Sequence, residues 1–353
     1  MFLKNRSSIL GVDISTSAVK VLQLGGNADR FQVEARALEP LPPGAVTDRN
    51  IADPDEVGNA IRRAVKASGS SAKSAAVAVP TSSVITRTVP MPSDRSTDEI
   101  ETEIRMEAPK YIPYPLDEVY LDFEVRGVSD SNPDTLDVTI VASRRENVEI
   151  RQEALEAAGL KATIVDVDAY AVENAFGVLA ERHPSIRPEH RVAVVDIGAA
   201  LTTLTVIQNG TTLYTRDQTF GCDQLTNNIG ETYGLSREQA EVARRSGDLP
   251  EDYGSTILAP FQQSVLDQIN HSLQFFTSAS HYSSVDCLLL IGGGSLLPGL
   301  DAFIMEHTGI PTFMGNPFEQ MSAARRVNRN TLMQEGPLFF VACGLALRSF
   351  DHS

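Results

Sequence analysis

The stretch Val194-Val195-Asp196-Ile197-Gly198-Ala199-Ala200-Leu201-Thr202 decides the fold, because an earlier stretch, Val12-Asp13-Ile14-Ser15-Thr16-Ser17-Ala18-Val19, repeats its pattern. In each stretch an apolar run typical of a buried strand ends on an aspartate, small residues form a turn, and a second strand follows. Aligning Asp13 with Asp196 places Ser15 opposite Gly198. Self-similarity of this kind indicates a duplication. We therefore expect two related halves with a cleft between them.

The composition is that of a folded, acidic protein. The chain has 353 residues, of which 42% are hydrophobic and 22% are charged, which is enough for two domains with separate cores. A net charge of -16 disfavours nucleic acid and anionic membrane surfaces as partners. Residues 1–8 lack a signal-peptide core, and no apolar run reaches the roughly 20 residues of a spanning helix. We expect a cytoplasmic protein that reaches a membrane only through a partner, with Cys222, Cys287 and Cys343 as reduced thiols.

The predicted elements divide the chain into a first domain, an insert and a second domain. Strands over 8–13, 18–24 and 31–38 are followed by a polar, proline-rich loop over 39–50 and a helix that begins after Asp53. Residues 84–163 are expected to form a separate α+β insert. The predicted ranges are 1–83 and 164–190 for the first domain, 191–332 for the second, and 333–353 for a C-terminal helix that returns to the first domain. The small residues of that helix allow it to cross the helix over 168–179 closely.

Three turns of small residues, each after an apolar strand, are typical of a phosphate-binding site. Backbone N–H groups in such turns hold anions, and glycine lets the phosphate approach. An aspartate repels phosphate, so the matched Asp13 and Asp196 predict a Mg²⁺ ion between carboxylate and phosphate, held through water. The small residues that we expect to bind nucleotide are Ser15, Thr16, Ser17, Gly198, Ala199, Thr202 and Gly221, with Gly292, Gly293, Gly294 and Ser295 in the third turn against adenosine.

Charged residues near these turns leave two interpretations open. Lys20 follows the first turn on a strand, where it could reach a phosphate or form a solvated charge on the strand face. Glu241 and Arg244 lie three positions apart on a predicted helix, where they could bracket the ribose and base or form a surface ion pair.

These motifs, in this order, resemble the actin-like ATPase superfamily. The matching segments are 13–16 with Lys20, 166–171, 196–198 with Thr202, 292–294 and the C-terminal helix, which correspond to two phosphate loops, two connecting helices and an adenosine loop. Within the superfamily the chain is similar to the PilM family of type IV pilus assembly proteins through segments 107–119, 166–171 and 291–300, and it also resembles FtsA, whose extra subdomain occupies the place of the insert. The resemblance implies an α/β, duplicated actin-like fold around a nucleotide cleft with a small inserted α+β subdomain.

The resemblance implies a scaffold that binds ATP and Mg²⁺, with the nucleotide setting the angle between the domains. It further implies that the insert and first domain hold the cytoplasmic N-terminal tail of a PilN-like inner-membrane protein, and that other pilus assembly proteins are further partners. Tyr111, Ile112, Tyr114 and Leu116 are the expected anchors, because aromatic residues dominate interface hot spots. Core packing is the alternative for Ile112 and Leu116.

Two residues bear on hydrolysis once the resemblance is accepted. Asp166 stands where the superfamily has an acidic residue before a connecting helix, so it is expected to orient the attacking water or to cap that helix. Ser15 stands where the superfamily usually has glycine, and its Cβ is expected to crowd the phosphates. We therefore expect binding and scaffolding, and leave slow hydrolysis open. A sugar or carboxylate kinase on the same fold is the alternative, but the chain lacks a glycine-rich catalytic loop or a His or Arg cluster for it.

Overall fold

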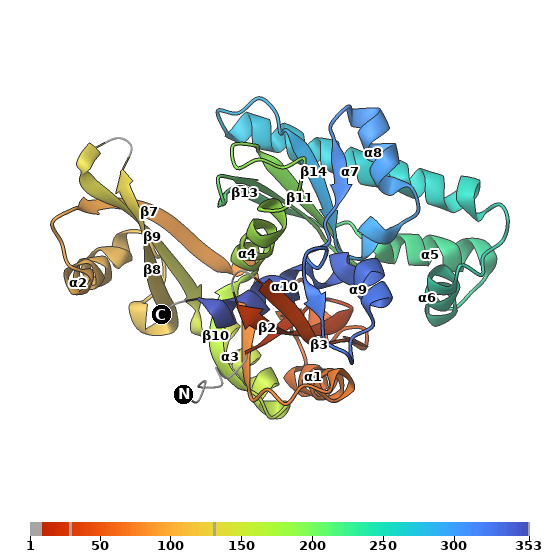
Figure 1. Ribbon diagram of the computed structural model, residues 1–353, viewed down its shortest axis with the longest axis horizontal. Coiled ribbons are helices and arrows are strands. Elements are labelled where there is room, and N and C mark those ends of the chain that lie inside the picture. Colours follow the sequence, from red (N-terminus) through yellow and green to blue (C-terminus); the bar gives the residue numbers. More distant parts are fainter. Residues whose placement is uncertain (1–8, 28–29, 130–131, 352–353) are drawn as a thin grey trace.

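The computed structural model describes residues 9–27, 30–129 and 132–351, so the segment 1–8 considered above lies outside the described residues. Two α/β bodies lie against each other, and a smaller unit projects from the first (Figure 1). The sheet of the first body has the strand order β10-β6-β1-β2-β3-β16. Its strands are β1 (Leu10–Ile14), β2 (Ala18–Asn27), β3 (Arg30–Pro40), β6 (Ser74–Val79), β10 (Lys161–Val167) and β16 (Ser322–Ala323).

The second sheet repeats this arrangement, with the order β13-β12-β11-β14-β15. Its strands are β11 (Val192–Ile197), β12 (Thr202–Gln208), β13 (Thr211–Gln218), β14 (Cys287–Ile291) and β15 (Thr312–Met314). In both sheets the first three strands form an antiparallel meander, and two further strands lie parallel beside the first strand. The duplication inferred from the two aspartates is therefore a duplication of whole sheets.

The two loops at the strand ends have the same backbone geometry. Asp13 pairs across its sheet with Lys20, and Asp196 pairs in the corresponding register with Thr203. The amide of Ser15 donates to the carbonyl of Ala18 at 3.0 Å, and the amide of Gly198 donates to the carbonyl of Leu201 at 2.9 Å. The serine in the first loop thus adopts the same turn as the glycine in the second.

Further helices belong to each of the two bodies. Helix α1 (Pro54–Ser68) begins as expected after Asp53, whose carboxylate accepts from the amide of Glu56 at 3.0 Å. The second body carries α5 (Cys222–Tyr233), α6 (Arg237–Ser246), α7 (Ala259–Ala279) and α8 (Leu300–Thr308), and a short α9 (Arg329–Glu335) follows. Within the described residues no helix is both long and apolar enough to cross a bilayer.

The insert is shorter than expected. It consists of β7 (Val84–Pro92), α2 (Thr97–Glu107), β8 (Val119–Ser129) and β9 (Asn132–Arg144), with a three-stranded sheet in the order β7-β9-β8. Helix α3 (Arg145–Ala157) packs instead on α1, so closely that a Cβ on Gly58 would lie 2.6 Å from the Cβ of Ala157, and β10 joins the first sheet. We therefore place the insert at 84–144, where the sequence had suggested 84–163.

The C-terminal helix packs on elements of the first body. Helix α10 (Phe340–Leu347) crosses α4 (Asp168–Ala180) (Figure 1). A Cβ on Gly344 would lie only 1.7 Å from the carbonyl oxygen of Ala171, so the crossing requires glycine.

The expected loop over 39–50 contains a small hairpin. Strands β4 (Val46–Thr47) and β5 (Asn50–Ile51) pair around Asp48 and Arg49, which have φ angles of +48° and +63°. Two consecutive positive φ values suit a two-residue hairpin turn. The sequence did not indicate this turn, because Asp-Arg lacks the glycine that usually marks it.

Candidate functional site

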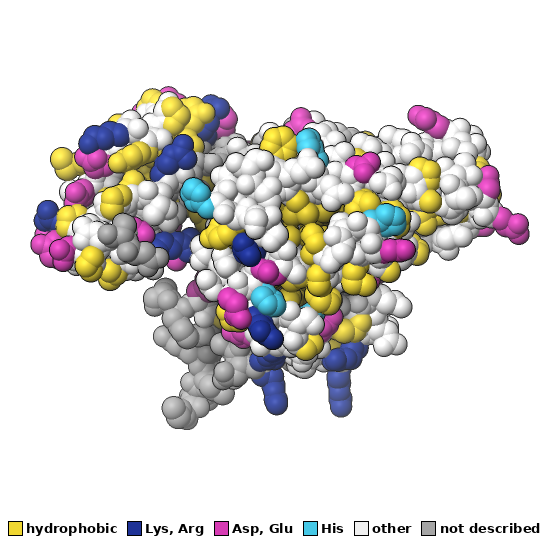
Figure 2. All heavy atoms as spheres, turned by 90° about the horizontal axis from the view of Figure 1, so that it is seen from above, with side chains coloured by type: hydrophobic (Ala, Val, Ile, Leu, Met, Phe, Trp, Pro, Cys, Tyr) yellow, Lys and Arg dark blue, Asp and Glu magenta, His cyan; other side chains and the backbone are white. Residues whose placement is uncertain are grey.

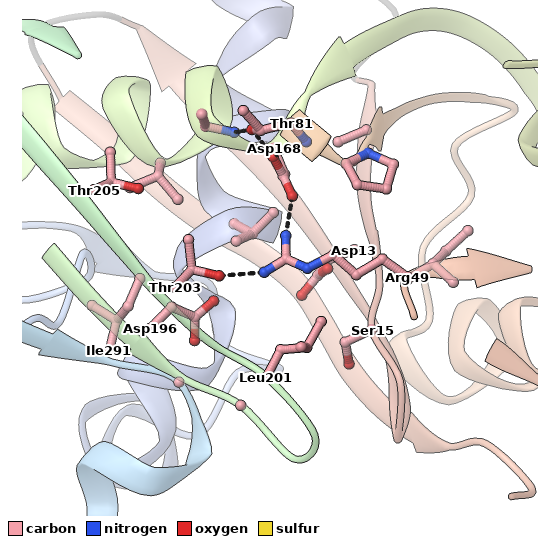
Figure 3. A pocket seen from close by; sticks show the side chains of 18 of the residues that line it. Asp13, Ser15, Arg49, Thr81, Asp168, Asp196, Leu201, Thr203, Thr205 and Ile291 are labelled. Atoms are coloured by element: carbon pink, nitrogen blue, oxygen red, sulfur yellow. Dashed lines mark hydrogen bonds and ion pairs between the residues drawn. The ribbon is translucent and has the colours of Figure 1, made fainter. Parts of the chain in front are cut away.

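Two adjoining cavities lie between the bodies. The small cavity, of about 130 Å³, is formed at the ends of β1 and β11, where the two loops face each other (Figure 3). The large cavity, of about 1070 Å³, is lined by parts of α6, α9 and the segment after β14. Lys20 and Gly293 line both cavities, so the two cavities adjoin, and together they are called the groove below.

The first loop brings Asp13, Ser15 and Lys20 together. The ammonium of Lys20 donates to the Asp13 carboxylate at 2.7 Å and to the hydroxyl of Ser15 at 3.2 Å, and that hydroxyl donates to the carbonyl of Ala18 at 2.8 Å. The Lys20 side chain is only 13% exposed. Of the two interpretations of Lys20, the structure therefore supports a cleft residue over a solvated charge. Thr16 also lines the small cavity, and Ser17 lines the large one.

The second loop presents Asp196 beside the third glycine turn. Gly292 has a φ of +78°, and a Cβ there would lie 2.2 Å from a carboxylate oxygen of Asp196. Burial raises the pKa of Asp196 above its ordinary value, although the positive charges of Lys20 and Arg49 oppose the increase. Gly198, Gly292 and Gly293 line the small cavity with it.

Several predicted nucleotide ligands support the loops without lining either cavity. The Thr202 hydroxyl donates to the carbonyl of Phe220 at 2.9 Å, and the Ser295 hydroxyl donates to the carbonyl of Gly292 at 2.7 Å. A Cβ on Gly221 would lie 2.3 Å from the carbonyl oxygen of Ala199, and one on Gly294 would lie 2.2 Å from the side chain of Ile197. These residues shape the turns through close packing, and Thr203, next to Thr202, is the threonine that faces the cleft.

Asp166 lies away from both cavities. Its carboxylate is 3.3 Å from the guanidinium of Arg348 and accepts from the amide of Val167 at 2.8 Å, and burial raises its pKa. The strand continues through Val167, and Asp168, the first residue of α4, faces the cleft instead. Asp166, which was expected to orient water, therefore does not line the cleft, whereas Asp168, two residues later, does.

Arg49, like Asp168 and Thr203, lines the cleft and was missed by the sequence analysis. Its guanidinium donates hydrogen bonds to the carboxylate of Asp168 on one side and to the hydroxyl of Thr203 on the other (Figure 3). The same guanidinium lies 3.3 Å from the carboxylate of Asp217. Burial lowers its pKa, but the carboxylates of Asp168, Asp217, Asp196 and Asp13 together raise it above the ordinary value.

On α6, Glu241 and Arg244 do not form the ion pair that the sequence analysis left open, and they have different surroundings. The Glu241 carboxylate bonds the guanidinium of Arg245. Arg244 lines the large cavity, and its buried Nε has no hydrogen-bond partner among the residues that the structure describes. Arg244 therefore remains a candidate contact for the nucleotide, whereas Glu241 does not line either cavity.

The predicted partner anchors differ in exposure. Ile112 is 3% exposed and packs with Ala108, Val119 and Ala142, so it is a core residue of the insert. Leu116 and Tyr111 are half-buried against the insert core. Tyr114 is 40% exposed, with the guanidinium of Arg144 5.5 Å from its ring centroid.

The side chains at the small cavity fit a magnesium ion that also binds phosphate. Among the described residues no three His, Cys, Asp or Glu side chains converge on one point. Asp13 and Asp196 nevertheless face the same cavity from the two bodies. Mg²⁺ keeps several waters and is usually held by one or two carboxylates with substrate phosphates. This donor set therefore suits the ion only together with a phosphate ligand.

The chain matches one protein family model and several solved structures over most of its length. A family model described as type IV pilus assembly protein PilM matches residues 11–350. The PilM–PilN type IV pilus biogenesis complex contains a chain that is 29% identical, with a TM-score of 0.79, and the match covers 98% of this chain and 100% of that one. The ethanolamine utilization protein EutJ from Carboxydothermus hydrogenoformans is 16% identical with a TM-score of 0.58, covering 96% of this chain and 89% of that one. The expected actin-like fold class is thereby confirmed.

Proposed function

Because the chain belongs to the PilM family of type IV pilus assembly proteins, we propose that it is an ATP-binding scaffold that holds the cytoplasmic N-terminal tail of a PilN-like inner-membrane protein. The observation that carries the nucleotide part is the meeting of two equivalent loops, with Asp13 and Asp196 facing one cavity. In this proposal the phosphates and Mg²⁺ lie at the loops, and the adenosine lies in the large cavity beside Gly293 and Arg244.

We infer that hydrolysis is at most slow. Besides Asp13 and Asp196, Asp168 is the acidic residue among those described that lines the small cavity, but its carboxylate accepts from Arg49 and from both the amide (2.8 Å) and the hydroxyl of Thr81. These three donors already occupy most of the roughly four acceptor positions of a carboxylate, so Asp168 has little capacity left to hold an attacking water. The geometry supports binding over catalysis, and the family match does not favour the kinase alternative.

The cleft is tested with a fluorescent ATP analogue. Asp13→Ala and Asp196→Ala are each expected to weaken binding in Mg²⁺ at least tenfold, because the carboxylates act through the ion. Far-UV circular dichroism should remain that of the wild type. Glu306→Ala, an exposed acid on α8, is the matched control and should bind normally. Wild-type affinity in both aspartate variants would refute the proposed cleft.

We propose Tyr114 as the exposed anchor for the tail, with Tyr111 and Leu116 beside it and Ile112 as core support. On the face shown in Figure 2 the insert presents apolar side chains among charges of both signs, a mixture suited to an amphipathic peptide. Binding to a membrane-anchored tail would place the protein at the inner membrane.

The partner assignment is tested with a synthetic peptide of the PilN-like tail. Tyr114→Ala is expected to weaken binding at least tenfold, since aromatic anchors carry much of the binding energy. Tyr120→Ala is the control, because Tyr120 is 39% exposed on the same insert. Equal losses in both variants would refute the role of Tyr114, and wild-type binding no tighter than millimolar would remove the partner proposal.

A further inference from the structure

The backbone of Arg49 is held in a defined conformation at the tip of the β4–β5 hairpin. Non-glycine residues with positive φ are uncommon, and two follow each other here, with φ of +48° at Asp48 and +63° at Arg49. The buried Arg151 on α3 holds this turn by donating to the carbonyl of Arg49 at 2.9 Å and to the carbonyl of Ala78 at 2.7 Å. The backbone of Arg49 is therefore fixed from below while its side chain extends into the cleft.

The guanidinium of Arg49 spans the two bodies. One terminal nitrogen bonds Asp168 at the start of α4, in the first body. The other bonds Thr203 on β12 and lies 3.3 Å from the Asp217 carboxylate on β13, in the second body. The Thr203 hydroxyl in turn donates to Asp217 at 2.7 Å, which makes the contact on the second body a small network.

The cations Lys20, Arg49 and Arg151 differ in which of the two cavities they line. Lys20 lines both cavities, whereas Arg49 lines only the small one. A nucleotide with its base in the large cavity would therefore reach Lys20 first and Arg49 last. Arg151 also lines the small cavity, but each of its three side-chain nitrogens already donates to a backbone carbonyl.

A polyphosphate needs a cation at this end of the groove. The carboxylates of Asp13, Asp168, Asp196 and Asp217 all act on Arg49. With Mg²⁺ at Asp13 and Asp196, the charges of Asp168 and Asp217 would still repel a terminal phosphate unless a cation lay beside them. A guanidinium is a planar fork of donors that matches phosphate oxygens. If one terminal nitrogen of Arg49 kept its bond to Asp168, the other could give up Thr203 and Asp217 and bind a phosphate oxygen instead.

We propose that Arg49 recognises the terminal phosphate of a bound nucleoside triphosphate, and that this contact replaces its link to Thr203 and Asp217. The inference rests on the proposed nucleotide site and adds a device by which the chain distinguishes triphosphate from diphosphate. It also connects the terminal phosphate to the contact between the two bodies, since the same guanidinium serves both. Arg49 acts here as a binding and positioning residue.

The test compares affinities for a non-hydrolysable ATP analogue and for ADP, both measured with Mg²⁺ on the full chain. Arg49→Gln is expected to lower the affinity for the ATP analogue at least tenfold and the affinity for ADP less than twofold. Asp217→Asn weakens the competing link and leaves Arg49 in place, so it is expected to strengthen analogue binding relative to ADP. Asp217 does not line the small cavity, which makes this variant a control for a purely structural cross-link.

The outcomes separate the inference from the proposed function. If the wild type binds both nucleotides but Arg49→Gln weakens them equally or not at all, the inference fails while the nucleotide site stands. If Asp217→Asn reproduces the loss of Arg49→Gln, Arg49 is only a link between the bodies. If Arg49→Gln does not fold, an unchanged or lowered preference for the analogue in Asp217→Asn still refutes the inference. If the wild type binds neither nucleotide, both proposals fall.

Discussion

The crossing of α10 over α4 can be tested by adding one methyl group. Gly344→Ala places a Cβ in the interior of a helix, where alanine is intrinsically better than glycine by about 1 kcal/mol. At this position, however, the new Cβ would lie 1.7 Å from the oxygen, 2.4 Å from the carbonyl carbon and 2.8 Å from the Cα of Ala171. All three are backbone atoms, so no side chain can rotate away and the helices must separate.

The expected cost follows from these contacts. Overpacking a close-packed interior typically costs 1–3 kcal/mol, and a clash with backbone belongs at about the upper end, roughly 3 kcal/mol. Subtracting the propensity gain of about 1 kcal/mol leaves a net destabilisation of about 2 kcal/mol. Because larger chains shift by roughly 2–4 °C per kcal/mol, the thermal midpoint should fall by about 4–8 °C.

The matched control lies on the partner helix. A Cβ on Gly177 of α4 would meet nothing within 4 Å, so Gly177→Ala should gain about 0.5–1 kcal/mol and raise the midpoint. Both variants are measured by thermal unfolding, with hydrogen exchange in α4 and α10 to locate the change. If Gly344→Ala were as stable as Gly177→Ala, the close approach of the two helices would be refuted.

Two further predictions follow from burial. Asp196→Asn should raise the thermal midpoint at pH 7, because the raised pKa of Asp196 means that its ionised form costs folding free energy above that pKa. This advantage should disappear below about pH 4, where the carboxyl is protonated in both states, and an advantage independent of pH would contradict it. Burial also raises the pKa of Cys222 and Cys287 to about 11 and raises that of Cys343. A thiol-specific disulfide reagent at pH 8 should therefore label none of the three in the native protein and all of them in denaturant, and rapid native labelling would show that these sites are open.

Several features could be predicted because their signal is local. The aspartate, the turn and the two flanking strands lie within about ten residues in each copy, so alternating apolar residues and small turn residues record them directly. The start of α1 was predictable for the same reason, since a cap involves residues three positions apart. The small residues of α10 indicated a close crossing, although only the structure identifies Ala171 as the contact.

The sequence by itself determined the duplicated architecture and the two loops that face the cleft. Only the tertiary structure decided which charges meet there: Arg49 bonds a carboxylate 119 positions away and a hydroxyl 154 positions away. The tertiary structure also showed that α3 packs on the first body and that Asp166 forms an ion pair with Arg348. The physical reason is that periodicity and turn chemistry act between neighbours in the chain, whereas an ion pair across a cleft depends on how separate sheets and helices pack.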